Sequence, residues 1–280
     1  MRGGGVFNLP AGSWTDDSSL TLALLDSIKR KGTIDLKHIM ENFIDWLDNG
    51  EFTPFGRSFD IGGGTMSAIC SYKHRKKPNQ CGGRDEQNNG NGSLMRILPV
   101  CLFCYAKKMD DVDAIKTIHH VGSLTHAHIR SNIACGLYYF MVRAILDEPD
   151  GGSIQDQLQR GLNNGFAYYE KMLADHENLA FYNRLRDLQL FADADEDMIK
   201  SSGYVVDTLE AAVWSLITTS SFEAALLKAV NLGGDSDTVG AVTGGLAGLF
   251  YGCQSIPPQW IETIQRRAWI EGLCESMLDD

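Results

Sequence analysis

Apolar residues recur at helical spacing along most of the chain. Near the start, Leu20, Ala23 and Leu24 share one helical face, and residues 34–48 repeat the pattern. Apolar positions separated by three and four residues predict amphipathic helices. Alternating apolar and polar runs are short, so no hairpin is predicted. Further predicted helical runs are 65–72, 93–106, 111–121, 127–147, 153–172, 176–191, 205–219, 222–231, 237–251 and 258–275.

Glycine and proline mark the loops between these runs. Residues 1–13 are rich in glycine, residues 50–64 end in three consecutive glycines, and residues 73–92 combine a basic run with Asn and Gly. Such residues favour turns, and the basic run is expected to be a solvated loop. No linker or internal repeat divides the chain. The sequence therefore predicts an all-α fold, with residues 1–280 forming one compact multi-helix domain.

Composition and charge narrow the classes of partner. A chain of 280 residues with 44% hydrophobic and 22% charged residues has the composition of a globular protein with a large core. Its net charge of −11 disfavours nucleic acid or an anionic membrane as the main partner. The uncharged stretch 238–257 has the length of a membrane span. It is rich in glycine and starts at an acidic cluster, so we expect an internal helix.

Seven cysteines are scattered along the chain without a signal-peptide pattern, which predicts a reducing cytoplasm. Cys101 and Cys104 form a C-x-x-C pair within an apolar run. No second pair completes a zinc site, so buried thiols on a helix are expected there.

Two acidic clusters at opposite ends of the chain indicate the chemistry. Asp16 and Asp17 begin one helical run, and Asp235 and Asp237 flank Ser236 at the beginning of another. If the fold joins the clusters, four buried carboxylates share a pocket, and such charges require cations. Carboxylate and hydroxyl oxygens suit Mg²⁺, Mn²⁺ or Ca²⁺. The sequence therefore predicts a two-metal site in a hydrolase.

Each cluster also has a simpler interpretation. The first acids would complement the helix dipole behind a capping Thr15, and the second cluster would be a solvated turn. The second cluster follows a Gly233-Gly234 turn and precedes glycines spaced by four residues, which would let another helix approach closely. Residues 235–239 also fit the D-x-D-x-[TV] pattern of aspartyl phosphatases, but that pattern should follow a buried strand.

Five stretches, in order, resemble the ADP-ribosylglycohydrolase family. The resemblance implies an all-α hydrolase with two Mg²⁺ or Mn²⁺ ions in a central cleft. It implies removal of ADP-ribose from a modified protein, or from an ADP-ribosyl small molecule, by cleavage at the anomeric carbon. The stretches are Pro10–Ser18, Phe59–Gly62, Gly90–Arg96, Leu124–His126 and Asn231–Gly240.

The same resemblance implies roles for individual residues. Asp16 and Asp17 would be catalytic, one of them orienting or deprotonating the attacking water. The glycine loop would lie along the diphosphate, Tyr204 near the adenine, and His126 against the substrate; a plain turn, a core aromatic and a core histidine are the alternatives. The implied metal ligands are Thr15, Asp16, Asp17, Asp235, Asp237 and Thr238. The implied substrate contacts are Gly62, Gly63, Gly64, Thr65, Asn91, Gly92, Ser93, His126 and Tyr204.

One departure from the family concerns the start of the chain. Family members usually begin with a further helix carrying a Gly-Asp-Ala-Leu-Gly-like motif and then a glutamate, and the resemblance implies that both are absent here. The alternative function is therefore a non-catalytic ADP-ribose-binding or crystallin-like relative. The attacked linkage, the choice between Mg²⁺ and Mn²⁺ and the oligomeric state are left open by the sequence.

Overall fold

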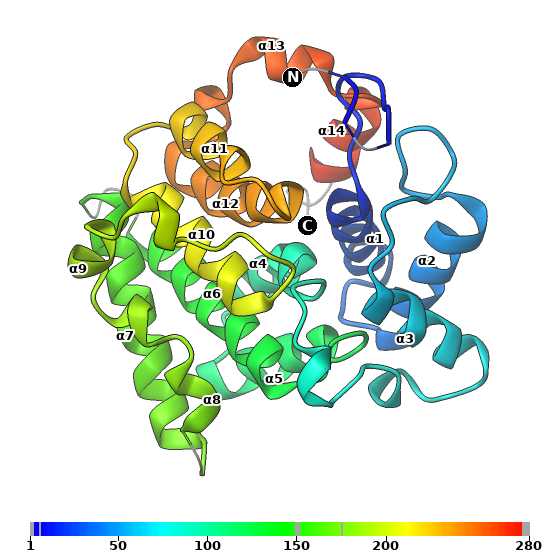
Figure 1. Ribbon diagram of the computed structural model, residues 1–280. Coiled ribbons are helices and arrows are strands. Elements are labelled where there is room, and N and C mark those ends of the chain that lie inside the picture. Colours follow the sequence, from blue (N-terminus) through cyan, green and yellow to red (C-terminus); the bar gives the residue numbers. More distant parts are fainter. Residues whose placement is uncertain (1–2, 6, 149–151, 175, 276–280) are drawn as a thin grey trace.

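The computed structural model describes residues 3–5, 7–148, 152–174 and 176–275, and helices form its regular structure (Figure 1). Within these ranges β-pairing is limited to isolated bridges, which confirms the all-α prediction. The α-helices are α1 (Asp16–Lys31), α2 (Leu36–Asn49), α3 (Gly63–Lys73), α4 (Leu98–Ala106), α5 (Asp111–Gly122), α6 (Ile129–Asp147), α7 (Ile154–Met172), α8 (Glu177–Ala180), α9 (Leu188–Ala192), α10 (Val205–Ile217), α11 (Phe222–Asn231), α12 (Ser236–Tyr251), α13 (Pro258–Thr263) and α14 (Arg267–Glu275). Short 3₁₀-helices are η1 (Pro78–Gln80), η2 (Glu86–Asn88), η3 (Leu94–Arg96), η4 (Asn183–Arg186), η5 (Glu196–Met198) and η6 (Cys253–Ser255).

Helix α6 is the central element of the core. It is buried on nearly all sides, and α4, α5, α7, α10 and α12 pack against it (Figure 1). A helix that is apolar around its whole circumference is stable only when neighbours cover every face. The largest buried side chains of α6 are Tyr138, Tyr139 and Phe140.

Helices α1 and α12, from opposite ends of the chain, pack against each other and against η3. The glycine face of α12 lets its neighbours approach closely, as the sequence predicted. Val230 and Leu226 of α11 cover Gly240 and Gly244, and a Cβ added at Gly245 would overlap Tyr138 Oη. This close packing holds the N-terminal end of α12 in place beside α1.

The predicted single helix 176–191 is wrong, because the chain forms α8, η4 and α9 there. Its buried residues Leu179, Tyr182, Leu185 and Leu188 recur at every third position. Side chains spaced by three residues eclipse one another in a 3₁₀-helix, whereas in an α-helix this stripe rotates out of register. The three-residue period therefore favours the tighter turns.

The predicted helix 258–275 is also wrong, because it breaks between α13 and α14. Arg266 has a left-handed backbone conformation (φ 49°). The break lets Gln265 donate hydrogen bonds to the carbonyls of Gly12 (3.1 Å) and Ala11 (3.0 Å). Arg266 donates to the carbonyl of Thr53 at 2.7 Å. The break thus ties the C-terminal helices to the loop that precedes α1.

The predicted helix 93–106 is likewise divided, into η3 and α4. Pro99 stands in the first turn of α4, where its missing N–H costs no intrahelical hydrogen bond. Cys101 and Cys104 of the C-x-x-C pair are free, buried thiols on α4, as expected. Burial raises the pKa of Cys104 to about 12, so this thiol is unreactive. The cytoplasmic location stays a prediction.

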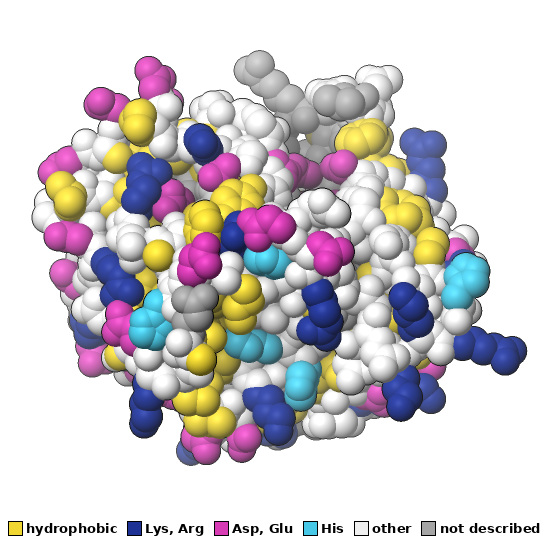
Figure 2. Space-filling model, turned by 60° about the horizontal axis from the view of Figure 1, so that its bottom comes forward, with side chains coloured by type: hydrophobic (Ala, Val, Ile, Leu, Met, Phe, Trp, Pro, Cys, Tyr) yellow, Lys and Arg dark blue, Asp and Glu magenta, His cyan; other side chains and the backbone are white. Residues whose placement is uncertain are grey.

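Charged side chains of both signs are interspersed on the surface shown in Figure 2, and no continuous basic area covers that face. Lys73 pairs with Asp48 at 2.7 Å, and Lys76 and Lys77 are exposed, so the basic run is a solvated loop as expected. No helix in the described ranges combines the length and the hydropathy needed to cross a bilayer.

Candidate active site

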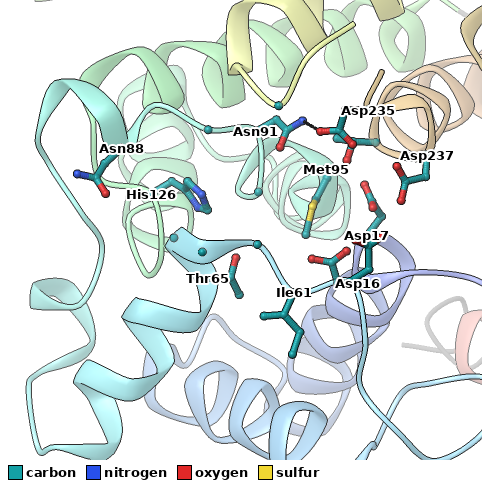
Figure 3. A pocket seen from close by; sticks show the side chains of 18 of the residues that line it. Asp16, Asp17, Ile61, Thr65, Asn88, Asn91, Met95, His126, Asp235 and Asp237 are labelled. Carbon is teal, nitrogen blue, oxygen red and sulfur yellow. Dashed lines mark hydrogen bonds between the residues drawn. The ribbon is translucent and has the colours of Figure 1, made fainter. Parts of the chain in front are cut away.

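The N-terminal ends of α1 and α12 face a common cavity of about 340 Å³. Asp16 and Asp17 lie in the first turn of α1, Asp235 precedes α12, and Asp237 lies in the first turn of α12. In Figure 3 their four carboxylates point toward the same space. A fifth carboxylate, that of Asp60, also lines this cavity. The structure therefore brings together the two acidic clusters that the sequence places more than 200 residues apart.

A strained turn places Asp235. Gly233 and Gly234 both adopt left-handed conformations, with φ values of 76° and 58°. Ser201 accepts a hydrogen bond from the Asp235 N–H at 2.8 Å, and its hydroxyl donates to the Gly233 carbonyl at 2.9 Å. A Cβ at Gly234 would overlap the Ser201 carbonyl. Only glycine fits at this position, both by conformation and by space.

Asn91 supports the Asp235 carboxylate from the other side. Its Nδ2 donates a hydrogen bond to Asp235 Oδ2 at 2.7 Å (Figure 3). It also donates to Thr208 Oγ1 at 2.9 Å. Both of its amide protons are therefore used to orient a neighbour. The structure assigns this side chain to positioning the acidic cluster, in addition to its place in the cavity wall.

Burial and mutual repulsion raise the pKa values of Asp16, Asp17, Asp60 and Asp235. Burial, followed by the charge of Asp17, raises the pKa of Asp16 to about 8. Burial, followed by the charge of Asp237, raises the pKa of Asp17 to about 7 and that of Asp60 to about 6. Five carboxyl groups around one cavity thus destabilise one another's charged forms, and a cation would relieve this repulsion.

The donor atoms fit hard divalent cations. Thr15 Oγ1 donates to Asp17 Oδ2 at 3.0 Å, while Asp17 Oδ1 is buried without a hydrogen-bond partner. A buried, unpaired carboxylate oxygen is costly and indicates a missing ligand. Among the described residues, no three acidic, histidine or cysteine side chains already converge as a metal-binding group. The carboxylates surround the cavity instead, and their chemistry matches that of Mg²⁺ or Mn²⁺ ligands.

Helix α3 presents its N-terminal end to the opposite side of the cavity. Gly62 precedes the helix, and Gly63, Gly64 and Thr65 form its first turn, so the predicted glycine loop is the start of a helix. The first intrahelical hydrogen bond runs from the Met66 N–H to the Gly62 carbonyl at 3.0 Å. The preceding N–H groups have no intrahelical acceptor, and they provide a positive helix end suited to a phosphate.

His126 closes the cavity beside this helix. Its imidazole contacts three glycines from separate segments, Gly64, Gly90 and Gly92. A Cβ at Gly64 would lie 2.8 Å from His126 Nε2. Burial, followed by the charge of Arg96, lowers the pKa of His126 to about 3, so the ring is neutral. In Figure 3 the ring faces the same space as Thr65.

Known proteins share this architecture. The profile of the ADP-ribosylglycohydrolase family matches residues 1–280. The ADP-ribosylarginine hydrolase Tri1 of Pseudomonas putida is 33% identical over 100% of this chain and 70% of its own length. The ADP-ribosyl-[dinitrogen reductase] glycohydrolase of Rhodospirillum rubrum is 30% identical over 95% of this chain and 79% of its own. A solved structure titled ADP-ribosylglycohydrolase-related protein complex has a TM-score of 0.76 and 29% identity, covering 99% of this chain and 84% of that one.

The chain belongs to the ADP-ribosylglycohydrolase family. It is therefore an enzyme that hydrolyses ADP-ribosyl groups. The family shows the class of reaction and the fold, and the cavity described above contains most of the residues predicted for the site. Those that line this glycohydrolase's cavity are Asp16, Asp17, Gly62, Gly63, Gly64, Thr65, Asn91, Gly92, His126, Asp235, Asp237 and Thr238.

Three predicted residues lie outside the cavity wall. Thr15 stands behind Asp17 and donates to it. Ser93 is fully buried beneath the site, where its hydroxyl accepts a hydrogen bond from the Cys135 thiol at 3.5 Å, and its contact with substrate stays a prediction. Tyr204 is half-buried beside the cavity, where its hydroxyl accepts a hydrogen bond from Arg130 at 3.2 Å. Its proximity to an adenine stays a prediction.

The structure also adds residues that the sequence reasoning did not select. Asp60 is the most important of these, because it faces Asp237 and has a left-handed backbone conformation (φ 55°). The sequence did carry a signal for Asp60, because this residue lies in one of the five stretches that resemble the family. The other added residues are Ile61, Gln87, Asn88, Gly90, Met95 and Gly203.

Proposed function

We propose that this glycohydrolase removes ADP-ribose from arginine side chains of modified proteins and that two Mg²⁺ or Mn²⁺ ions are required. Two relatives at 33% and 32% identity, from Pseudomonas putida and Serratia proteamaculans, are named ADP-ribosylarginine hydrolases. The observation that carries the metal requirement is the group of five carboxyl side chains around one cavity, in which the pKa values of Asp16, Asp17 and Asp60 are raised and Asp17 Oδ1 is unpaired.

The metals would be held by side chains of α1 and α12 and of the residues before them. When bound, the ions would hold hydroxyl groups and water together and lower the pKa of that water. The proposed ligands are Thr15, Asp16, Asp17, Asp235, Asp237 and Thr238.

The two ends of the cavity suggest the orientation of the substrate. The diphosphate would accept hydrogen bonds from the first turn of α3, because free N–H groups and the helix dipole favour an anion there. The ribose would then extend toward the carboxylates of α1 and α12. This orientation keeps the negative diphosphate away from the acidic cluster and brings the anomeric carbon toward it.

Two carboxyl groups would divide the proton transfers of the hydrolysis. Asp16 would orient the attacking water and accept its proton, while the water oxygen bonds to the anomeric carbon and the bond from that carbon to the arginine nitrogen breaks. Asp60 is half-buried at the cavity wall, and its pKa is raised to about 6. A carboxyl group whose pKa is raised toward neutral pH retains a protonated fraction there, and that fraction can donate its proton to the departing nitrogen. Burial and repulsion thereby separate the roles of chemically identical side chains.

The competing interpretations receive less support. An aspartyl phosphatase places its D-x-D motif after a buried strand, whereas here Asp235 follows α11 and begins α12. A non-catalytic ADP-ribose binder is the alternative within the family, and turnover of a modified protein separates it from the enzyme.

The decisive assay uses a protein that carries ADP-ribose on arginine. Free ADP-ribose should appear with Mg²⁺ or Mn²⁺ and stop after chelation, and Asp237→Ala should lose both metal uptake in calorimetry and turnover. Asp193→Ala, which changes an exposed aspartate, is the matched control. Full turnover by the Asp237 variant, or by chelated enzyme, would refute the metal requirement. Release from serine-linked but not arginine-linked substrate would refute the proposed linkage.

A further inference from the structure

Arg96 is a fully buried cation at the end of η3. Within the described residues its hydrogen bonds run to neutral acceptors. Its guanidinium donates to the Gly92 carbonyl and, at 2.7 Å, to Thr125 Oγ1, and it packs over the Phe43 ring at 5.1 Å. Burying a charge is costly, and replacing such a residue by an apolar one is often neutral or stabilising. The position of Arg96 beneath the active site therefore indicates a role beyond stability.

A chain of hydrogen bonds leads from Arg96 to the cavity. Arginine has no acceptor atom, so Arg96 Nη2 must donate to Thr125 Oγ1. Thr125 Oγ1 lies 2.8 Å from His126 Nδ1. Thr125 is 1% exposed, so the proton of its buried hydroxyl requires a protein acceptor. Among the described residues, His126 Nδ1 is the acceptor within hydrogen-bond distance.

The direction of these bonds determines the tautomer of His126. A neutral imidazole has one N–H and one acceptor nitrogen, and the hydrogen bond made by one nitrogen decides the state of the other. We propose that Arg96 acts through Thr125 as a positioning residue, holding His126 as the neutral tautomer whose Nε2–H is directed into the substrate cavity. The opposite tautomer would leave the Thr125 hydroxyl without an acceptor. A doubly protonated ring would add a second positive charge beside Arg96.

The backbone around His126 prevents the ring from turning away. The N–H of Ala127 donates to the Gly83 carbonyl at 2.8 Å, which holds the segment in place. Gly64, Gly90 and Gly92 enclose the ring, and a side chain at Gly92 would lie 2.6 Å from His126 Cε1. The ring therefore keeps one orientation, with Nε2 next to the first turn of α3.

This inference rests on the proposed function for the identity of the acceptor. The Nε2–H of His126 lies beside Gly64, whose N–H belongs to the free N-terminal end of α3. Both groups would donate to the same diphosphate of an ADP-ribosyl substrate. A neutral, fixed donor of this kind selects an oxygen acceptor and holds the part of the substrate that does not react.

The tautomer can be measured in the resting enzyme without substrate. Protein labelled with ¹⁵N at its seven histidines is studied by long-range ¹H–¹⁵N correlation, and the signal missing in His126→Gln assigns the ring. The wild type and Thr125→Ser should show a protonated Nε2 and an unprotonated Nδ1. Thr125→Val should show a mixture of tautomers. Thr125→Ala serves in its place if the valine variant does not fold.

Kinetics give a second readout. Loss of the hydrogen bond from His126 to the charged diphosphate should raise the KM of Thr125→Val about tenfold with little change in kcat. Thr125→Ser should keep the KM of the wild type. Thr117→Val, which changes a hydroxyl on α5, is the control. A wild-type spectrum showing Nδ1–H or imidazolium at neutral pH would overturn the proposal, and so would an unchanged tautomer in Thr125→Val and Thr125→Ala. Because the spectrum needs no substrate, lack of turnover on arginine-linked substrate with the expected tautomer would refute the proposed function alone.

Discussion

The raised pKa of Asp17 predicts how the stability of the metal-free enzyme depends on pH. Burial and Asp237 raise this pKa from 3.8 to about 7, so the folded chain retains a proton that the unfolded chain has released. The resulting stabilisation is complete below about pH 3.8 and is lost as the pH rises through about 7. The difference between the folded and unfolded pKa values of Asp17 corresponds to about 4 kcal/mol of stabilisation. Of this, about 3 kcal/mol is lost between about pH 5 and about pH 9.

Asp17→Asn removes this titration while keeping the shape of the side chain. In chelator, the free energy of unfolding of the wild type should fall by about 3 kcal/mol more than that of the variant between about pH 5 and about pH 9. The charge of Asp17 also raises the pKa of Asp16, so the decline that Asp16 contributes should be smaller in the variant, which adds to the difference.

Urea unfolding at both pH values measures the difference, and Asp193→Asn, at an exposed site, should behave as the wild type does. Saturating Mn²⁺ should abolish the loss of unfolding free energy at high pH in the wild type, and it should not do so in Asp17→Asn. Parallel pH profiles for the wild type and Asp17→Asn in chelator would refute the account of a mutually repelling carboxylate cluster.

Two further substitutions test the supports of Asp235. Asn91→Leu removes the donor to its carboxylate, and calorimetry should show metal binding weakened about 10- to 100-fold, whereas Asn79→Leu at an exposed site should have no effect. Gly234→Ala should lower the free energy of unfolding by about 3 kcal/mol in urea titrations, because the new Cβ overlaps a carbonyl. Gly233→Ala has a similar φ but open space and should lose only about 1 kcal/mol, so equal losses would contradict the steric explanation.

Local sequence patterns predicted most helices well. Asp35 and Gly50 stand at the two ends of α2, where a capping residue and a left-handed glycine are expected. The errors arose where tertiary contacts competed with a helix. Between 258 and 275, hydrogen bonds from Gln265 to the loop before α1, and from Arg266 to Thr53 in the loop after α2, compensate for an interrupted helix. Those partners lie more than 200 residues away, so no local pattern could reveal them.

The sequence predicted the acidic residues of the candidate site better than it predicted the residues around them. Paired aspartates before apolar runs, and a glycine turn before Asp235, are visible in the sequence. Asp60 was visible only as part of a matching stretch, because one aspartate in a loop shows no role of its own until the fold turns it toward Asp237. Ser93 also occurs in a matching stretch, and only the fold shows that it is buried beneath the cavity.

The amino-acid sequence by itself determined the helices, the acid pairs at two helix starts and the glycine face of α12, because these depend on neighbours a few residues away. The tertiary structure decided which helix ends meet. Only long-range packing placed the acids of α1 beside those of α12, opposite the free N–H groups of α3. The same packing joined Arg96, Thr125 and His126 into one hydrogen-bonded chain, whose proton positions follow from burial and not from any spacing along the sequence.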